Sequence, residues 1–228
     1  MMGTTHDIAQ EYEFEFTKIW TRDNYKRLRD AINNNREFLL DFDVSLIDWK
    51  EEFFDGNQDE FLRFAYHVKN KKCLEIGSGA CGALAQWVWI KHRTIIEPLL
   101  DKINEFMLEE FDYTWYDNRI KKYSHVAERF VPELDNAVDG FIICRNVLDH
   151  TAEPYSILEN ISLYAKEGCY LLLWNDLYHL DGPDDGHFNI TKDVIGWKKT
   201  IQDHGFEIIS EYIMDKNTIN YGCRAIKI

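Results

Sequence analysis

The sequence predicts an α/β fold that is built on a mostly parallel sheet and preceded by a helical region. Three observations predict it. After residue 72, short apolar runs alternate with helical segments, these runs are continuously apolar, and one of them closes on the glycine pattern G-x-G-x-x-G. Continuous apolar strands are typical of a parallel sheet that helices cover on both faces. A chain of 228 residues is long enough for one large core with a small appendage.

The first third of the chain has the pattern of polar helices. Further short helices are predicted over residues 48–54 and 59–68, and the region contains neither a glycine loop nor metal-ligand spacing. We therefore expect a helical cap, residues 1–70, packed on a core formed by residues 71–228. The cap prediction rests on apolar residues that recur at roughly helical spacing between charged ones, namely Ile19, Trp20, Tyr25, Leu28, Ile32, Leu39 and Leu40.

In the core region, strands and helices are predicted in alternation. A helix over residues 191–204, with Thr191 as its N-cap, should end at Gly205. Two strands over residues 206–213 and 221–228 then form an antiparallel pair at the sheet edge, joined by a turn at residues 215–217. The preceding strands are expected at residues 73–76, 94–96, 120–126, 140–144 and 169–174, and the helices between them at 83–91, 99–110 and 156–164.

Composition narrows the classes of partner. Forty acidic against 26 basic residues give a net charge of −14, and such a surface repels nucleic-acid backbones. No apolar run approaches the length of a membrane span, and none resembles a signal peptide. The five cysteines form no C-x-x-C pair, which predicts a reduced, cytoplasmic protein. We expect a small-molecule substrate, no nucleic acid and no membrane, with a homodimer left open.

The glycine pattern and one acid predict a nucleotide-binding βαβ unit. Residues 74–82 read L-E-I-G-S-G-A-C-G, and Glu97 lies 20 residues after Gly77. Gly77 and Gly79 allow a sharp turn beside a ligand, and Gly82 lets the helix lie close to the strand. Glu97 can accept both hydroxyl hydrogens of a ribose. An adenosine-like cofactor is expected, although NAD, FAD and S-adenosylmethionine proteins share the glycine pattern.

Two further features favour S-adenosylmethionine. Glu75 is an ionisable residue at the end of a buried strand, two positions before Gly77. Dinucleotide folds normally have an apolar residue there, whereas a carboxylate suits a ligand with a cationic amino-acid end, directly or through water. The antiparallel pair after five βα units is the second feature.

With these motifs, residues 72–228 resemble the class I S-adenosylmethionine-dependent methyltransferases, in particular the type-11 small-molecule group. Residues 125–132 are similar to the family's A-E-x-h-P segment, which flanks the adenine, and residues 138–150 to its fourth-strand motif. Residues 158–168 stand where the family has L-x-E-x-x-R-V-L-K-P-G-G, but they lack its arginine and second glycine. The resemblance implies a Rossmann-like seven-stranded sheet in which the final antiparallel strand inserts beside the fifth.

The motifs and the resemblance together give a set of cofactor-binding residues. The first motif and the acid after the second strand contribute most of them, and the segments after the third and fourth strands contribute the rest. The predicted residues are Glu75, Gly77, Ser78, Gly79, Gly82, Glu97, Ala127, Glu128, Arg145 and Asn146.

Catalytic candidates must follow the fourth and fifth strands, near the methyl group. Methyl transfer depends mainly on alignment, and a hydroxyl nucleophile also benefits from a base. His187 lies in residues 181–188, which resemble the family's D-G-P-H-x-H-x-F lid, and it is the predicted base. His150 and Asp176 are the other catalytic candidates. In the alternative interpretation, His150 packs the next helix and His187 only contacts substrate or solvent.

No metal site is predicted, with one alternative left open. Loop acids and neighbouring residues could bind a hard cation, since some O-methyltransferases use such residues after strands four and five. The predicted function is O-methylation of a small polar molecule such as a sugar or glycan precursor. Its alternatives are N- or C-methylation, a cofactor-binding partner subunit without catalysis, and an NAD-dependent oxidoreductase. The residues that could bind a cation are Asp149, Asn175, Asp176, His179, Asp184 and Asp185.

Overall fold

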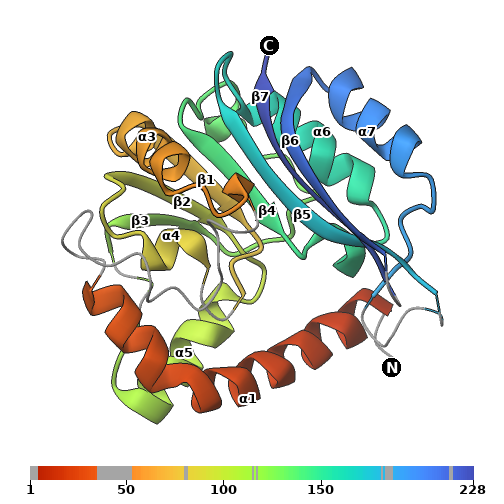
Figure 1. Cartoon of the computed structure of the whole chain (residues 1–228). Helices are drawn as coiled ribbons and strands as arrows, with labels where there is room; N and C mark the ends of the chain where they lie inside the picture. Colours follow the sequence, from red (N-terminus) through yellow and green to blue (C-terminus); the bar gives the residue numbers. More distant parts are fainter. Residues whose placement is uncertain are drawn as a thin grey trace.

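The computed structural model describes residues 5–34, 53–79, 82–114, 116, 118–180, 182, 187–215 and 218–228. Within these ranges seven strands form one sheet, in the order β3-β2-β1-β4-β5-β7-β6 (Figure 1). The first five strands are parallel, and β7 lies antiparallel between β5 and β6. The predicted sheet and its inserted last strand are confirmed. The strands are β1 (Lys72–Ile76), β2 (His92–Ile96), β3 (Ile120–Tyr123), β4 (Phe141–Arg145), β5 (Tyr170–His179), β6 (Phe206–Asp215) and β7 (Thr218–Lys227).

Helices cover both faces of the sheet, as the continuous apolar strands predict. Neighbouring strand residues point to opposite faces: Phe141 and Ile143 join the core under α3, α4 and α5, whereas Ile142 and Cys144 join the core under α6 and α7. No described helix is both long and apolar enough to span a membrane. The helices are α1 (Thr5–Asn34), α3 (Gln58–Val68), α4 (Ala83–Gln86), α5 (Leu100–Phe111), α6 (Pro154–Tyr164) and α7 (Val194–Asp203), with short 3-10 turns η2 (Pro132–Leu134) and η3 (Leu148–His150).

Several predicted boundaries differ from the structure, and three of the differences have a visible cause. The helix predicted over residues 83–91 ends at Gln86, because Trp87 leaves the helical conformation and buries its side chain in the core. The strand predicted to end at residue 174 continues to His179, since pairing with β7 extends it. Thr191 is not the N-cap of α7. Asp193 is, because its side chain accepts a hydrogen bond from Gly196 N.

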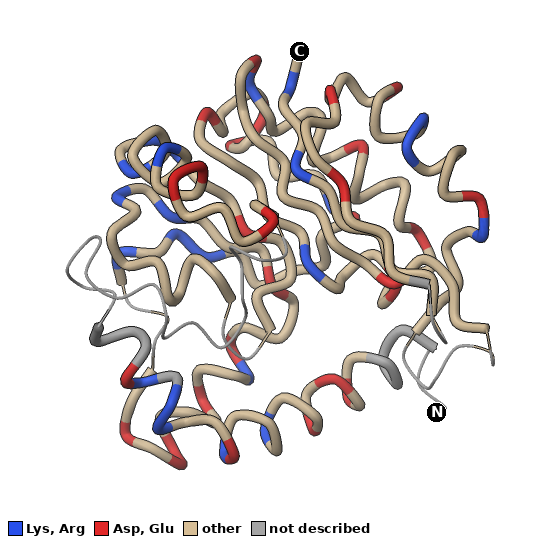
Figure 2. The backbone as a smooth tube through the Cα atoms, viewed as in Figure 1, with Lys and Arg blue, Asp and Glu red and all other residues tan. Residues whose placement is uncertain are grey.

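The predicted cap contributes two helices with different surroundings. In α3, Phe61 and Phe64 pack into the same core as the central strands. The long helix α1 instead runs along the carboxyl edge of the sheet (Figure 1), and Figure 2 shows both signs of charge along it. Arg22 pairs with Glu110 of α5 through both carboxylate oxygens. The cap boundary at residue 70 stays a prediction, and the helices predicted around residues 39–40 and 48–52 lie outside the described residues.

Candidate active site

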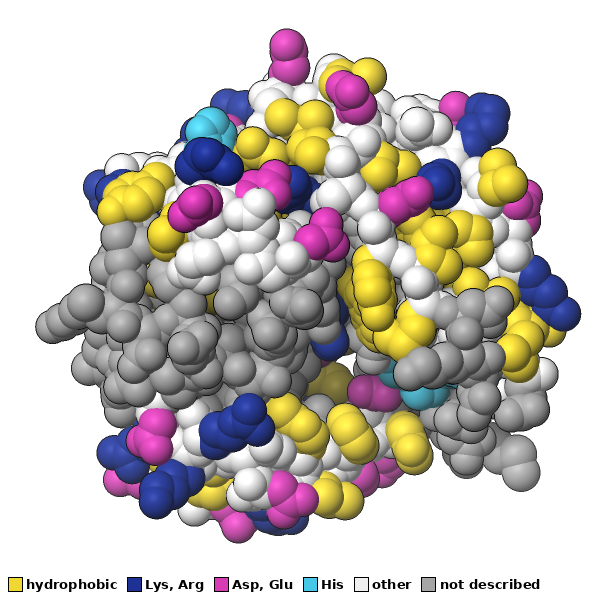
Figure 3. Space-filling view, in the orientation of Figure 1, with side chains coloured by type: hydrophobic (Ala, Val, Ile, Leu, Met, Phe, Trp, Pro, Cys, Tyr) yellow, Lys and Arg dark blue, Asp and Glu magenta, His cyan; other side chains and the backbone are white. Residues whose placement is uncertain are grey.

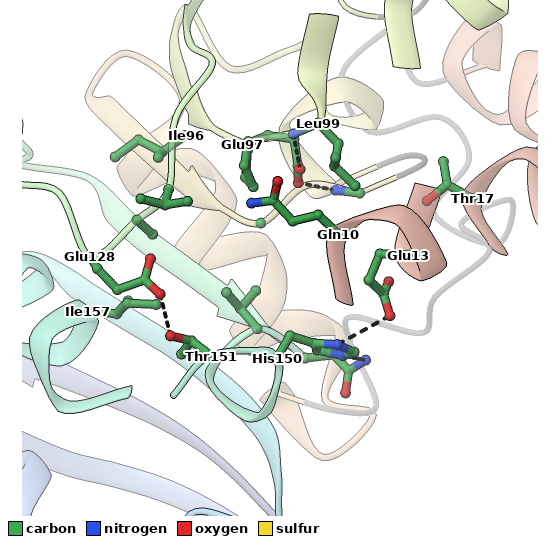
Figure 4. Close-up of a pocket in the computed structure, with 17 residues that line it drawn as sticks. Gln10, Glu13, Thr17, Ile96, Glu97, Leu99, Glu128, His150, Thr151 and Ile157 are labelled. Carbon is green, nitrogen blue, oxygen red and sulfur yellow. Dashed lines mark hydrogen bonds and ion pairs between the residues drawn. The ribbon is translucent and has the colours of Figure 1, made fainter. Parts of the chain in front are cut away.

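A pocket lies at the carboxyl ends of β1, β2 and β4, with α1 on its other side (Figure 4). The pocket has a cavity volume of about 140 Å³ and opens to solvent. The face shown in Figure 3 is hollowed beside α1. Parallel α/β sheets bind their ligands at this edge, so the pocket is where the sequence motifs predict the cofactor.

The glycine loop after β1 forms one wall of the pocket. Gly77 and Gly79 both have positive φ angles, +68° and +52°. A Cβ on Gly77 would lie 2.2 Å from a methyl carbon of Val147, which follows β4, whereas a Cβ on Gly79 would meet no atom within 4 Å. Two loops from adjacent strands therefore meet at Gly77, and Gly79 borders open space.

We predict that Gly77→Ala destabilises the protein far more than Gly79→Ala. Both substitutions place a side chain at positive φ, which costs about 1 kcal/mol, but only alanine at residue 77 also collides with Val147. Gly77→Ala should therefore lower the free energy of unfolding by about 3 kcal/mol in urea titrations. Adding Val147→Ala should recover part of the loss. Equal losses for the two single variants would contradict this packing.

Glu97, directly after β2, is fixed by two backbone groups. Its side chain is 4% exposed. One carboxylate oxygen accepts a hydrogen bond from Gly79 N (2.9 Å) and the other from Leu99 N (2.9 Å), as Figure 4 shows. Burial raises the pKa of Glu97, against the effect of these two amides. Each oxygen keeps a second lone pair, so the pocket wall carries a rigid acceptor.

The segment after β3 closes the pocket on the α6 side. Val126, Ala127 and Glu128 all line it. Asn160 of α6 donates hydrogen bonds to the carbonyl oxygens of Ala127 (2.9 Å) and Glu128 (3.0 Å). Thr151 donates to the Glu128 carboxylate. The segment is therefore held by side-chain hydrogen bonds, and it presents both an apolar surface and a carboxylate.

The α1 helix supplies pocket residues that sequence reasoning missed. Gln10, Glu13 and Thr17 line the pocket opposite the strands, and Glu13 Oε1 lies 3.2 Å from His150 Nδ1 (Figure 4). Their spacing of three to four residues, which places them on one helix face, was the available signal. That spacing is common on solvated helices and does not single out a pocket.

Three histidines and two aspartates gather beyond the His150 end of the pocket. His150 Nε2 lies 3.7 Å and His187 Nε2 lies 3.9 Å from the same oxygen of Asp149. His179, the last residue of β5, lies 3.9 Å from Asp176, and its ring centroid is 5.3 Å from that of His187. We call these five residues the histidine–aspartate cluster.

Backbone hydrogen bonds bring the cluster together. Phe188 N donates to Asp149 O (2.5 Å), which places His187 beside η3. His179 N donates to the side chain of Asn189 (2.8 Å). Asn175 accepts bonds from Val147 N and Leu148 N and so fixes the turn that leads to Asp149. Hydrogen bonds that link residues 147–149, β5 and residues 188–189 thus hold the cluster together.

Burial shifts the protonation of two cluster members. Burial raises the pKa of Asp149 to about 7, and the charge of Asp176 adds to this while His150 opposes it. Burial also lowers the pKa of His187, with further lowering by His150 and His179. His187 is therefore neutral near pH 7 and can accept a proton.

Several solved structures share this architecture at low sequence identity. The [4+2]-cyclase SpnF matches over 100% of this chain and 97% of its own, with a TM-score of 0.56 and 14% identity. An S-adenosylmethionine-dependent methyltransferase from Methanosarcina mazei matches over 70% of this chain and 93% of its own (TM-score 0.50, 14% identity). A variant of a 16S rRNA adenine methyltransferase from Catenulisporales acidiphilia matches over 75% and 92% (TM-score 0.50, 11% identity).

The chain has the class I methyltransferase fold. No model of a known protein family and no curated protein matches its sequence, so the type-11 subgroup stays a prediction. In a class I methyltransferase fold the cofactor lies at the carboxyl edge of the sheet, where this pocket is found. Of the residues predicted from sequence, the following line the pocket: Gly77, Gly79, Glu97, Ala127, Glu128, Asn146 and His150.

Four predicted cofactor residues do not line the pocket. They are Ser78, Gly82, Arg145 and Glu75. Ser78 accepts a hydrogen bond from the Tyr116 hydroxyl (3.1 Å). Arg145 lies over the ring of Trp174, 4.9 Å from its centroid. Gly82 is the N-cap of α4, and a Cβ there would lie 2.2 Å from Glu75 Oε1. Each of these residues therefore has a contact within the protein. A direct contact between these residues and the cofactor stays a prediction.

Glu75 caps the short helix α4. Its two carboxylate oxygens accept hydrogen bonds from Ala83 N (2.7 Å) and Leu84 N (2.8 Å), and the residue is 3% exposed. The carboxylate at this position therefore has a structural partner. Of the predicted loop residues, Ala80, Cys81, Asp181, Asp184 and Asp185 lie outside the described residues.

Glu75 should make stability depend on pH. Burial raises its pKa from 4.5 to about 7, against the effect of the Leu84 and Ala83 amides. Folding thus favours the protonated form, so the Glu75 contribution is fully present below pH 4.5 and is lost as the pH rises to about 7. The loss is about 3 kcal/mol. The difference in unfolding free energy between wild type and Glu75→Gln should fall across this interval. A difference that is constant with pH would contradict the shift.

Proposed function

We propose that this protein is an S-adenosylmethionine-dependent methyltransferase that acts on a small polar molecule. The observation that carries the proposal is the buried Glu97 carboxylate, held by the amides of Gly79 and Leu99 at the wall of a pocket between loops of the sheet. A fixed acid after β2, beside a glycine turn after β1, suits a ribose and the group attached to it. The class I fold supports the same cofactor.

The residues present fit this cofactor. Glu97 would accept hydrogen bonds from the ribose hydroxyls. Ile96, Leu99 and Val126 offer an apolar surface for the adenine, and the turn at Gly77–Gly79 leaves room for the amino-acid end. When bound, S-adenosylmethionine supplies a methyl group that its sulfonium already activates.

The chain itself would align the acceptor and remove its proton. Such alignment accounts for roughly 7–11 kcal/mol of a barrier. The histidine–aspartate cluster borders the pocket through His150 and supplies imidazoles that can accept a proton. A hydroxyl nucleophile benefits most from such groups, so the proposed reaction is O-methylation, for example of a sugar or glycan precursor. N- or C-methylation is the alternative.

The proposed acceptor is not nucleic acid, and the proposed compartment is the cytoplasm. A net charge of −14 repels phosphate backbones, although one protein of similar fold is an rRNA methyltransferase. Cys73, Cys144, Cys169 and Cys223 are free and buried, in keeping with a reducing compartment.

A cofactor-binding protein without methyl transfer is the second candidate. SpnF, which matches the whole chain, is described as a cyclase. The test is transfer of labelled methyl from S-adenosylmethionine to a panel of hydroxylated metabolites, with ribosomal RNA included. Methylation of a small hydroxylated compound supports the proposal. Cofactor binding with no transfer to any compound favours the second candidate, and methylation of RNA alone would overturn the proposed acceptor class.

A further inference from the structure

The hydrogen-bonding capacity of the buried Asp149 carboxylate is not satisfied by the described residues around it. It is 0% exposed. Within the part of the chain that the structure describes, neither of its carboxylate oxygens has a hydrogen-bond partner. Burying a carboxylate without partners is costly, and buried charges in proteins are generally paired or coordinate metals. The groups that face it most closely are the imidazoles of His150 and His187.

The spacing of these groups allows one shared metal ion after small shifts of the side chains. Two bonds of about 2.1 Å to a common ion separate the ligand atoms by at most about 4.2 Å. The two distances from Asp149 are 3.7 Å to His150 Nε2 and 3.9 Å to His187 Nε2, and all three ligand atoms lie within 4.8 Å of one another. They are too far apart for hydrogen bonds and close enough for shared coordination after small shifts.

The contacts of His150 favour a ligand role. Glu13 faces its Nδ1 at 3.2 Å, and Asn146 Nδ2 faces its Nε2 at 3.3 Å. A proton on Nδ1 suits the carboxylate, which leaves the lone pair on Nε2, the nitrogen that faces Asp149. A bound ion would replace the Asn146 amide as the partner of this lone pair. Metal-binding histidines commonly have a carboxylate at the other nitrogen. Figure 4 shows this contact between α1 and His150.

We propose that Asp149, His150 and His187 bind a divalent transition-metal ion beyond the His150 end of the pocket. Imidazole ligands suit zinc, iron, cobalt or nickel better than magnesium or calcium, which replaces the hard cation left open by the sequence. Three protein ligands leave a position for an outside oxygen. Asp176 and His179, both in β5, form a second triplet with Asp149.

The role of this ion in the reaction rests on the proposed function. A metal-bound hydroxyl or carboxylate of the acceptor would be held next to the cofactor pocket, and the ion would lower the pKa of a bound hydroxyl. As a ligand of the ion, His187 would assist loss of the hydroxyl proton to water and would not itself accept that proton. Asp149 and His187 do not line the pocket that contains Glu97, so His150 is the one proposed ligand that also borders the cofactor pocket.

Metal binding can be measured without activity. The full chain, first treated with a chelator, is titrated with Zn²⁺ by calorimetry and with Co²⁺ by visible absorption. We expect one tight equivalent, and affinity lower by about 100-fold or more in Asp149→Asn and in His187→Ala. His92→Ala is the matched control, since His92 is exposed at the start of β2. Thermal melts check that the variants fold, and His187→Ala serves if Asp149→Asn does not.

Two results would overturn the metal site: no tight equivalent in the wild type, or equal affinity in wild type and both variants. These results are separate from the proposed function. A protein that transfers methyl groups at full rate after chelation, and binds no metal, retains the function and loses this inference. A protein that binds one metal ion but neither binds S-adenosylmethionine nor transfers methyl groups retains the site and loses the function.

Discussion

Glu97→Ala should weaken S-adenosylmethionine binding by about 100-fold or more, because the ribose hydroxyls lose a charged acceptor. The substitution also leaves the amides of Gly79 and Leu99 without their partner, which loosens the loop that surrounds the ligand. Calorimetry with S-adenosylmethionine and with S-adenosylhomocysteine measures the effect.

Glu128→Ala is the matched control for Glu97→Ala. Glu128 also lines the pocket, but its carboxylate accepts from a Thr151 side chain and holds no glycine-loop amide. Glu128→Ala should weaken S-adenosylmethionine binding less than Glu97→Ala does. Unchanged affinity in Glu97→Ala, or a larger loss in Glu128→Ala, would remove the role assigned to Glu97.

His187→Ala should reduce turnover by about 100-fold or more, whether His187 accepts the proton or holds the proposed ion. Its ring lies 4.3 Å from that of His150 by centroids, yet it does not line the cofactor pocket. Affinity for S-adenosylmethionine should therefore stay within about twofold. Steady-state rates and calorimetry on the same preparation give both quantities, with His92→Ala as control. Turnover at the wild-type level would show that His187 has no part in the reaction.

The sheet and the cofactor end of the site follow from local signals in the sequence. The run of residues 141–144 is continuously apolar because both faces of β4 are buried, and that pattern is visible without tertiary information. The glycine loop and Glu97 are local signals as well, since positive φ at Gly77 and a buried acid after the next strand are properties of one βαβ unit.

The histidine–aspartate cluster depends on contacts between distant segments. His179 lies in β5 only because β7, about forty residues later, pairs with that strand. The bond from Phe188 N to Asp149 O brings His187 to His150. Glu13 reaches His150 from a helix at the other end of the chain. No spacing in the sequence indicates that these segments come together. The histidines and aspartates can therefore be predicted as single candidates, but their cluster cannot.

The short α4 shows a different limit. The run of residues 87–90 has an acceptable helical pattern. Burial of Trp87 and Ile90 in the core under β1 and β4 stabilises the protein more than a longer helix would. Tertiary burial overrides local preference in such short segments.

The central claim is that the pocket beside Glu97 binds S-adenosylmethionine. Calorimetric titration of the wild-type chain with S-adenosylmethionine, and separately with NAD, tests it most directly. We expect one equivalent of S-adenosylmethionine to bind and to be displaced by S-adenosylhomocysteine, with no heat of binding for NAD. Binding of NAD with no response to S-adenosylmethionine would contradict it.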